Sequence, residues 1–491
     1  MSTLTSPRQL PVAVIGAGPV GLAAAAHLLE RAIEPLVLEA APAVGANLLN
    51  YGHVPLFSPW RYNLDNAVAR ALSRHGWQSP DPDALPLARE VVERVLAPYV
   101  ALDEVKAFVH CGHRVIAIAR DGFDKVKSAG RSAAPFTLRV ATKAGVSDMR
   151  ARAVIDASGT WTTPNPLGAN GLPARGEEGA AAQIHYGIPD VTGAAKQRYL
   201  GKRVLVVGAG HSAANALLSL AELADEDAGT RIAWALRGHS LERVFGGGAA
   251  DALPARGRLG SQLRALQDAG RLQLVSDFRI ASLVRRDGKL AVHGHGADAR
   301  EKHIDGVDEI ICATGQRPDL GITRELRLKL DPWLESTADL GPLIDPNLHS
   351  CGTVRPHGHR ELSHPEAGFY TVGVKSYGRA PTFLMTTGFE QVRSVAAALA
   401  GDLEAADRVE LVLPETGVCN SNLGDASGGC GVDASLPVEH DVTEPAAVAA
   451  EGCCRPAHPT TDPERELPVV SDVRATRGKP VPIRVEAKRC C

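Results

Sequence analysis

Three glycines and one carboxylate near the N-terminus have the spacing of a dinucleotide-binding turn. Gly16, Gly18 and Gly21 form a G-x-G-x-x-G pattern directly after an apolar run, and Glu39 ends the next apolar run. Gly16 allows a tight turn, Gly18 lets a pyrophosphate approach the backbone, and Gly21 lets a helix pack closely on a strand. Glu39 can accept hydrogen bonds from both hydroxyls of an adenosine ribose. The pattern therefore predicts a site for the phosphates and ribose of a dinucleotide.

A second glycine turn lies near the middle of the chain. Gly208 and Gly210 begin a G-x-G-x-x-A pattern that includes Ser212 and ends at Ala213, again directly after an apolar run. The next apolar run is followed not by an acid but by Arg237, whose guanidinium can bind a ribose 2′-phosphate. An ordinary surface arginine is the alternative interpretation. The first site thus favours an unphosphorylated ribose, and the second favours a phosphorylated one.

Each glycine turn lies between a predicted strand and a predicted helix. Each follows a short β-branched run that is typical of a buried strand and precedes a helix rich in small residues, in residues 11–39 and again in 202–223. A glycine pattern alone is weak evidence, but strand, turn, helix and strand within about thirty residues are specific. The repeat strengthens the prediction for both copies. A βαβ unit without a ligand remains the alternative.

Other segments predict how the chain is divided. Strand patterns at residues 105–109, 114–119 and 136–140 predict a small β-layer, and residues 280–293 predict a hairpin around Asp287-Gly288. Two predicted strands end in similar tripeptides, Ala157-Ser158-Gly159 and Ala313-Thr314-Gly315. A proline-rich crossing at 161–173 marks a boundary. We predict a first dinucleotide-binding domain in two parts, residues 1–165 and 311–412, with a second dinucleotide-binding domain, residues 166–310, inserted between them. A tail, residues 413–491, follows.

Composition excludes some classes of partner. The 491 residues are 44% hydrophobic and 22% charged, which suits about two or three soluble domains. The net charge of -3 gives no electrostatic reason to expect nucleic acid or an anionic membrane as partner. Because no apolar run reaches the length of a membrane span and the N-terminus has no apolar signal segment, we expect a cytoplasmic protein with reduced thiols. The assembly state is open, with a homodimer among the options.

The C-terminal segment has a different composition. It is rich in Pro, Gly, Ala, Glu and Thr without a helical or strand period, so we predict that it is largely disordered. It holds two adjacent cysteine pairs, Cys453-Cys454 and Cys490-Cys491. Adjacent cysteines form a strained disulfide, whereas soft ions such as trivalent arsenic or mercury suit two thiolates. The pairs are therefore speculative ligands for a thiophilic metal or metalloid, and incidental cysteines in a tail are the alternative.

With both turns and both tripeptides in view, the chain resembles the two-dinucleotide-binding-domain flavoproteins, and among them the flavin-containing monooxygenases and thioredoxin-reductase-like oxidoreductases. The resemblance covers roughly residues 10–405. It implies an α/β fold with two Rossmann-like domains of the three-layer ββα type, with FAD at the first turn and NADPH at the second. The cofactor-binding residues that it implies are Gly16, Gly18, Pro19, Gly21, Glu39, Gly159, Gly315, Gly373 and Gly388 on the FAD side, and Gly208, Gly210, Ser212, Ala213 and Arg237 on the NADPH side.

The chain also differs from both groups. Val374 follows Gly373, where the reductase-like group usually carries an acid that holds the ribityl chain. The segment from Gly179 to His185 lacks the phenylalanine and the spacing of the F-x-G-x-x-x-H motif of the monooxygenases, and the chain has no C-x-x-C pair of the kind that disulfide reductases place beside the flavin. His185 nevertheless remains a candidate catalytic residue.

The expected chemistry is hydride transfer from NADPH to FAD. Arg61 and Asn63 are further candidate catalytic residues, because they end an aromatic stretch, 51–63, that could line a flavin or substrate surface or could instead anchor a surface loop. The first hypothesis is an FAD monooxygenase that oxidises a small soft nucleophile with dioxygen, in a reaction linked to arsenic or another thiophilic toxicant. One alternative is a flavin reductase whose metal, metalloid or thiol acceptor is delivered by the tail cysteines. The other is a thiol-metal-binding protein with a flavoprotein scaffold.

Overall fold

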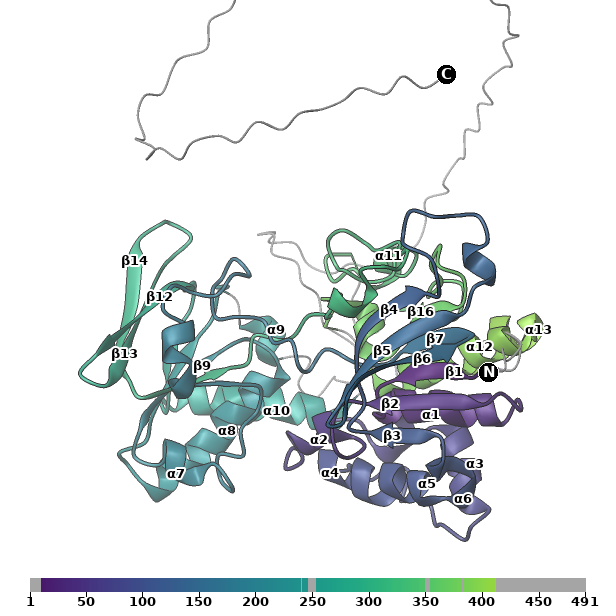
Figure 1. The fold of residues 1–491 in the computed structure, drawn as a ribbon. Helices are drawn as coiled ribbons and strands as arrows, with labels where there is room; N and C mark the ends of the chain where they lie inside the picture. The colour runs from purple at the N-terminus through teal and green to yellow at the C-terminus, as the bar shows by residue number, and fades with distance from the viewer. Residues whose placement is uncertain (1–9, 240, 246–252, 349–353, 382, 412–491) are drawn as a thin grey trace, which may run out of the picture. The chain divides into compact units, whose positions relative to one another are not determined.

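The computed structural model describes residues 10–239, 241–245, 253–348, 354–381 and 383–411 (Figure 1). All of these residues belong to one unit of the chain, residues 1–424. The predicted disordered tail and its cysteines, Cys453, Cys454, Cys490 and Cys491, lie outside the described residues, so the predictions about them stay predictions.

The first glycine turn belongs to a five-stranded parallel sheet with the strand order β16-β7-β1-β2-β3. Its strands are β1 (Val12–Ile15), β2 (Pro35–Glu39), β3 (Val109–Cys111), β7 (Ala153–Asp156) and β16 (Phe369–Thr371). The two central strands β1 and β7 are buried at every residue, as expected for a parallel sheet that is covered on both faces. In the register, Ile15 at the end of β1 pairs with Asp156 at the end of β7.

Helices cover one face of the first sheet, and a second, smaller sheet covers the other. On the helical face, Val12 and Val14 join a core with α1 (Pro19–Leu29), α3 (Asn66–Ser73) and α12 (Met385–Ala400). On the opposite face, Ala13 and Ile15 pack with Phe136 in a core shared with the antiparallel sheet β4-β5-β6. This smaller sheet contains β4 (Arg114–Arg120), β5 (Phe136–Thr142) and β6 (Gly145–Ala151).

The second glycine turn belongs to another five-stranded parallel sheet, with the strand order β11-β10-β9-β15-β8. Its strands are β8 (Ile184–Tyr186), β9 (Arg203–Val207), β10 (Arg231–Ala235), β11 (Gln273–Val275) and β15 (Glu309–Cys312). Val204 and Val206 face α8 (His211–Glu226) and α10 (Pro254–Asp268), whereas Leu205 and Val207 face an antiparallel sheet. That sheet contains β12 (Arg279–Arg286), β13 (Lys289–His295) and β14 (Glu301–Val307). The predicted α/β class with two ββα domains is therefore confirmed.

Short helices complete the described part of the chain. They are α2 (Ala46–Leu49), α4 (Ala88–Val91), α5 (Ala97–Ala101), α6 (Asp103–Lys106), α7 (Lys196–Tyr199), α9 (Glu242–Phe245), α11 (Gly341–Ile344) and α13 (Leu403–Asp407).

The predicted hairpin is present between β12 and β13. Its two turn residues, Asp287 and Gly288, both have positive φ, at 50° and 80°, and this conformation matches the twist of the flanking strands.

One strand prediction was wrong. Residues 105–109 do not form a strand of the small β-layer, because α6 occupies residues 103–106 and the strand starts only at Val109. Acidic residues at the start of α6, Asp103 and Glu104, stabilise the positive end of the helix dipole. The short strand that follows is β3, which pairs in parallel with β2 and extends the first sheet.

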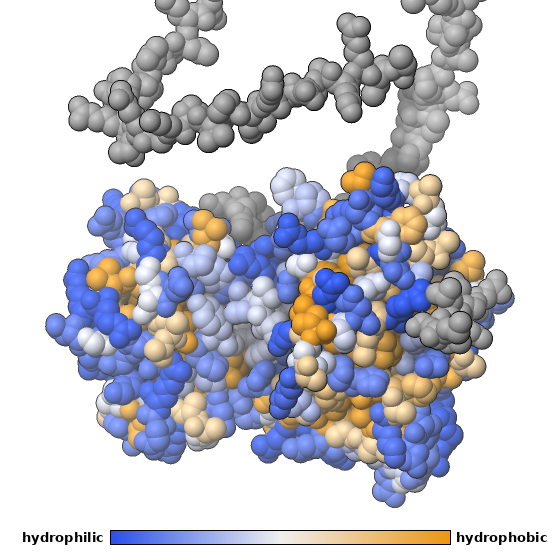
Figure 2. Space-filling model, viewed as in Figure 1, coloured by the Kyte–Doolittle hydropathy of each residue, from blue (hydrophilic) through white to orange (hydrophobic). Residues whose placement is uncertain are grey.

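The described part of the surface exposes some large hydrophobic side chains. The face drawn in Figure 2 is mainly hydrophilic, and its hydrophobic residues lie in small patches between hydrophilic ones. Large exposed hydrophobic side chains include Val126, Trp333 and Leu348, and single exposed side chains of this kind are normal. Among the helices that the structure describes, none is long and apolar enough to cross a bilayer.

Candidate functional site

Two of the three glycines of the first turn are required by the protein atoms around them. Gly16 has a φ of +99°, and a Cβ on it would lie 2.7 Å from the Ala157 carbonyl oxygen. A Cβ on Gly21 would lie 1.9 Å from the Gly16 oxygen. A Cβ on Gly18, by contrast, would meet no described heavy atom within 4 Å. The outer glycines thus pack the turn, and the middle one leaves open space in front of the backbone, where a pyrophosphate would fit.

The helix after the turn presents its N-terminus to that open space. Gly18 is the N-cap of α1 and has no side chain to occupy the first backbone N–H groups, while Pro19 at the first helical position has no N–H to satisfy. The first turn of α1 contains no acidic residue. The remaining N–H groups and the positive end of the helix dipole therefore suit an anion.

Glu39 is fixed at the end of β2 by two backbone groups. The Ala17 and Ala41 backbone N–H groups donate to its two carboxylate oxygens, each at 2.8 Å. Each carboxylate oxygen has further acceptor capacity. The side chain is therefore held in one position with lone pairs left for the ribose hydroxyls that the sequence predicts. Together with the open space at Gly18, this arrangement fits the adenosine diphosphate half of FAD.

The second turn repeats this geometry with one change. Gly208 has a φ of +137°, and a Cβ on it would lie 2.2 Å from the Ala313 carbonyl oxygen, whereas a Cβ on Gly210 would meet no described heavy atom within 4 Å. Gly210 is the N-cap of α8, and Ser212 lies in the first turn of this helix. The third position is Ala213, which is fully buried, so the helix here has room for the methyl group.

Arg237 lies two residues beyond the end of β10 and is exposed. One of its guanidinium nitrogens donates to the Ala169 carbonyl oxygen at 3.2 Å. Its guanidinium has five N–H donors in total, so one bond of this kind leaves donors for a 2′-phosphate. His239 lies nearby in the sequence and makes a 3.5 Å ion pair with Asp277 when it is protonated.

Two chain segments that cross between the sheets are bonded to each other. The first follows Gly159 after β7, and the second includes Gly315 after β15, and both glycines have positive φ. The Asn165 backbone N–H donates to the Gly315 oxygen at 2.9 Å, its side-chain amide donates to the Thr314 oxygen at 3.1 Å, and the Thr314 hydroxyl donates back to the Asn165 oxygen at 2.8 Å. The two segments that end in similar tripeptides thus lie side by side and are joined by hydrogen bonds. We call this pair of segments the hydrogen-bonded crossing.

The structure brings the predicted return segment to the first turn. A Cβ on Gly388 in α12 would lie 2.5 Å from a Val20 side-chain carbon, and a Cβ on Gly373 would lie 3.4 Å from another. Gly373 has a φ of +67°, and its N–H donates to Gln391 Oε1 at 2.7 Å. Val20 follows Pro19 in the first turn of α1. Both glycines therefore allow the returning chain to approach the helix end where the first cofactor is expected.

The sequence prediction missed one group of side chains at this place. The Lys375 ammonium donates to Asp156 Oδ2 at 2.7 Å and to the Ser158 hydroxyl oxygen at 3.0 Å. Asp156 could have been noticed in the sequence, because an acid at the end of a fully apolar strand needs a partner when it is buried. Lys375 has no comparable local signal.

The predicted catalytic residues do not form one group. Arg61 is exposed and pairs with Asp83. Asn63 is 2% exposed, and its amide donates to the Ser58 and Pro59 oxygens at 2.6 and 3.0 Å. His185 lies in β8 of the second sheet, where burial and then the Arg198 and His53 charges lower its pKa. A neutral imidazole at pH 7 can accept a proton, but the catalytic roles of Arg61, Asn63 and His185 stay predictions.

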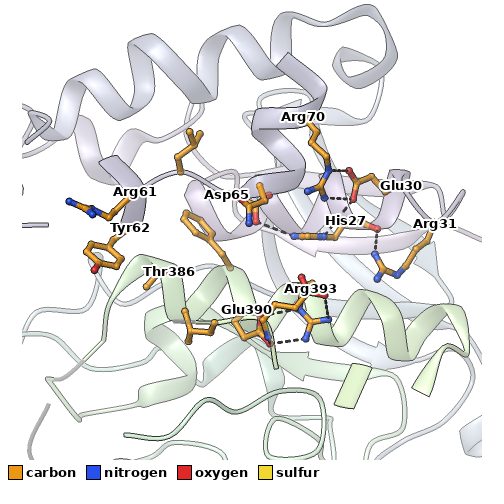
Figure 3. A pocket seen from close by; sticks show the side chains of 15 residues that line it. His27, Glu30, Arg31, Arg61, Tyr62, Asp65, Arg70, Thr386, Glu390 and Arg393 are labelled. Atoms are coloured by element: carbon orange, nitrogen blue, oxygen red, sulfur yellow. Dashed lines mark hydrogen bonds and ion pairs between the residues drawn. The ribbon is translucent and has the colours of Figure 1, made fainter. Parts of the chain in front are cut away.

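A cavity of about 520 Å³ lies between α1, α3 and α12 rather than at either glycine turn (Figure 3). Six of its charged side chains form three pairs within the cavity, as the dashed lines in Figure 3 indicate. The pairs are His27 with Asp65 at 3.0 Å, Arg70 with Glu30 at 2.9 Å, and Arg393 with Glu390 at 2.7 Å. Because these charges compensate each other, we assign no ligand to this cavity.

A family model described as pyridine nucleotide-disulphide oxidoreductase matches residues 10–339. The chain belongs to this family. The match covers more than half of the chain and confirms the predicted flavoprotein group. No curated protein sequence matches this chain.

Solved structures of low sequence identity share the fold. Bacillithiol disulfide reductase from Bacillus cereus is 20% identical, with a TM-score of 0.57 and coverage of 80% of this chain and 99% of that one. DfoA, the FAD-bound cadaverine monooxygenase from Erwinia amylovora, is 13% identical, with a TM-score of 0.57 and coverage of 84% and 99%. The ornithine N-hydroxylase of Kutzneria sp. 744, solved with reduced FAD and NADP⁺, is 16% identical, with a TM-score of 0.54 and coverage of 80% and 99%. FAD, which the sequence predicts, is bound in the DfoA structure, and FAD and NADP⁺ are both bound in the ornithine N-hydroxylase structure.

Proposed function

We infer that this family member is an NADPH-dependent FAD oxidoreductase, with FAD at the first glycine turn and NADPH at the second. The observation that carries this inference is the pair of turns itself. Each turn has open space at its middle glycine, and one is followed by the carboxylate of Glu39 while the other is followed by the guanidinium of Arg237. A carboxylate repels a 2′-phosphate and a guanidinium attracts one.

The residues of this chain bind and orient the two cofactors. Gly18 and the N-terminus of α1 would receive the FAD pyrophosphate, and Glu39 would hold the adenosine ribose. Gly210 and Ser212 at the start of α8 would receive the NADPH pyrophosphate, with Arg237 at the 2′-phosphate. FAD held there would supply the redox chemistry, which is hydride transfer from the nicotinamide and electron transfer to a further acceptor.

We propose dioxygen as that acceptor and a small soft nucleophile, such as a sulfur or trivalent arsenic compound, as the substrate. Two relatives of the same fold are a cadaverine monooxygenase and an ornithine N-hydroxylase. The free thiols in the described part of the chain are not activated: burial raises the pKa of Cys312 to about 12 and also raises the pKa of Cys111. A protonated thiol is a poor nucleophile, which favours oxygenation over disulfide reduction.

A reductase is the second candidate, because two observations favour it. A bacillithiol disulfide reductase shares the fold, and the adjacent pairs Cys453-Cys454 and Cys490-Cys491 could deliver a metal, metalloid or thiol acceptor.

Oxygen separates the two candidates. NADPH oxidation by the purified protein should be measured with and without dioxygen, and with and without trivalent arsenic. A monooxygenase consumes dioxygen together with NADPH and substrate, so anaerobic turnover should stop. Sustained anaerobic turnover would favour the reductase, and its loss after deletion of residues 415–491 would assign acceptor delivery to the tail. A purified protein that binds no flavin would contradict both candidates.

A further inference from the structure

A buried lysine lies beside the first glycine turn and has none of the roles described above. Lys375 follows the returning Gly373 by two residues, and its side chain is 2% exposed. Its ammonium donates to Asp156 Oδ2 at 2.7 Å and to the Ser158 hydroxyl oxygen at 3.0 Å. A buried ammonium is tolerated only where a nearby charge and hydrogen-bond acceptors compensate it. The Asp156 side chain, which is 0% exposed, provides that compensation.

The Asp156 carboxylate lies at the carboxyl end of β7, at the edge of the first sheet where FAD is expected. Asp156 ends β7 and pairs in register with Ile15 at the end of β1 and with Thr371 at the end of β16. Gly16 follows Ile15 directly, and a Cβ on Gly16 would lie 2.7 Å from the oxygen of Ala157. In open parallel sheets, ligands bind outside the carboxyl ends of the strands. The ion pair therefore lies where the ends of three strands meet, at the edge where FAD is expected.

The same carboxylate also fixes the chain that follows it. Asp156 Oδ1 accepts hydrogen bonds from the Ser158 N–H at 3.1 Å and from the Ser158 hydroxyl at 2.6 Å. Gly159 comes next with a φ of +73°, and a Cβ on it would lie 3.8 Å from a Val374 side-chain carbon. Asp156 thus fixes the chain next to Gly159, and its partner Lys375 is the neighbour of Val374, which lies close to that glycine.

We propose that Lys375 and Asp156 are a positioning pair for FAD. The pair fixes the Ser158–Gly159 backbone and Val374 beside the first glycine turn and keeps the charge at this place balanced. The inference rests on the proposed FAD site. Since the pair has no net charge, removing one member leaves a single buried charge, negative in one case and positive in the other. Two single variants should therefore act on bound flavin in opposite directions.

The test is the two-electron midpoint potential of bound FAD, together with the FAD dissociation constant of the apoprotein. Reduction adds negative charge to flavin, so the unpaired Asp156 of Lys375→Met should lower the potential, and the unpaired Lys375 of Asp156→Asn should raise it. The double variant has no unpaired charge and should return the potential toward that of the unaltered protein. Lys375→Met should also weaken FAD binding about tenfold or more.

A matched control breaks another buried ion pair of the FAD-binding part. Arg393 and Glu390 in α12 form a 2.7 Å pair with side chains that are 8% and 6% exposed. Arg393→Met should lower the unfolding midpoint and leave the flavin potential unchanged. If Lys375→Met does not fold, Asp156→Asn and the double variant still give the sign and the reversal of the shift.

Shifts of the same sign in both single variants, no shift in either, or an equal shift in Arg393→Met would overturn the proposed role of the pair. These results would leave the FAD site itself intact, because they require bound flavin. Absence of FAD from the unaltered protein would instead contradict the proposed function.

Discussion

The two glycine turns follow one plan but differ in how closely the helix packs on the strand. At the third position of the first turn, a Cβ on Gly21 would lie 1.9 Å from the Gly16 oxygen. At the same position of the second turn, Ala213 places its methyl group in a fully buried site without such a conflict. The comparison teaches that the third glycine of this pattern is a packing requirement of the individual helix, whereas the open space at Gly18 and Gly210 is common to both turns.

Exchanging the residues at the third position of the two turns should have the largest effect and tests the difference in packing directly. Gly21→Ala forces a backbone shift in the first turn, so we expect a loss of about 3 kcal/mol or more in the free energy of unfolding and the loss of bound flavin. Ala213→Gly should cost only about 1 kcal/mol, because it adds backbone freedom without a clash. Urea unfolding and the flavin absorbance of both purified variants measure these effects. Equal destabilisation by the two changes would contradict the difference in packing.

The acid that follows the first turn provides the next largest effect. Glu39→Ala removes the acceptor for the Ala17 and Ala41 N–H groups and for the ribose hydroxyls, so FAD binding should weaken about a hundredfold. Glu39→Gln keeps the shape of the side chain and one acceptor oxygen, so it should weaken FAD binding only about tenfold. Fluorescence titration of the apoproteins with FAD measures both dissociation constants. Unchanged FAD binding in Glu39→Ala would remove the role of this carboxylate.

The arginine that follows the second turn should affect only one of two nicotinamide cofactors. Arg237→Ala should raise the Michaelis constant for NADPH about tenfold and leave that for NADH nearly unchanged, because NADH has no 2′-phosphate. Steady-state kinetics with both cofactors measures the ratio, and Arg231→Ala, which replaces an exposed arginine at the other end of β10, is the control. An equal rise for NADPH and NADH would contradict 2′-phosphate binding at Arg237.

A fall in pH should affect the stability of the first sheet through one buried histidine. Burial lowers the pKa of His364, which packs against Phe369 of β16 at the edge of the first sheet, to about 4. Between pH 6.5 and 4 the unfolded chain binds a proton at this histidine and the folded chain does not, so stability falls as the pH falls. The loss should be about 1 kcal/mol per pH unit.

Urea unfolding at pH 7 and pH 5 measures this loss, and His364→Gln should reduce it. His185→Gln provides the matched variant at β8, the edge strand of the second sheet, where burial also lowers the histidine pKa. The same pH dependence in His364→Gln and in the unaltered protein would exclude His364 as its source.

The parts of the fold that depend on local pattern could be predicted from the sequence. The two strand–turn–helix units and the hairpin at Asp287-Gly288 were found because glycine spacing and apolar runs lie within a few residues of each other. β14 was not predicted, because three of its seven residues are exposed and four carry polar or charged side chains, and only its pairing with β13 makes it a strand. Residues 105–109 misled the prediction because alternating apolar residues there belong partly to a short helix.

The candidate site shows the same limit. The positions of Glu39 at the end of β2 and of Arg237 just after β10 could be predicted, since each follows an apolar strand run after a glycine turn, and their ligand-binding roles stay predictions. The contact between Asp156 and Lys375 joins residues 219 positions apart, and no spacing in the sequence indicates it. Gly373 and Gly388 were placed by resemblance, and their actual partner, Val20, becomes visible only when the helices are packed together.

The hydrogen-bonded crossing has a consequence for how this chain can be divided into separate domains. Because Asn165 and Gly315 are joined by a 2.9 Å backbone hydrogen bond, the chain leaves the part that contains the first sheet and returns to it at nearly the same point. The intervening residues behave as an insertion with adjacent ends, so a short connector between these two positions could replace them. The module between these positions is therefore open to excision, or to exchange for one that accepts a different electron donor, without the first sheet being rebuilt.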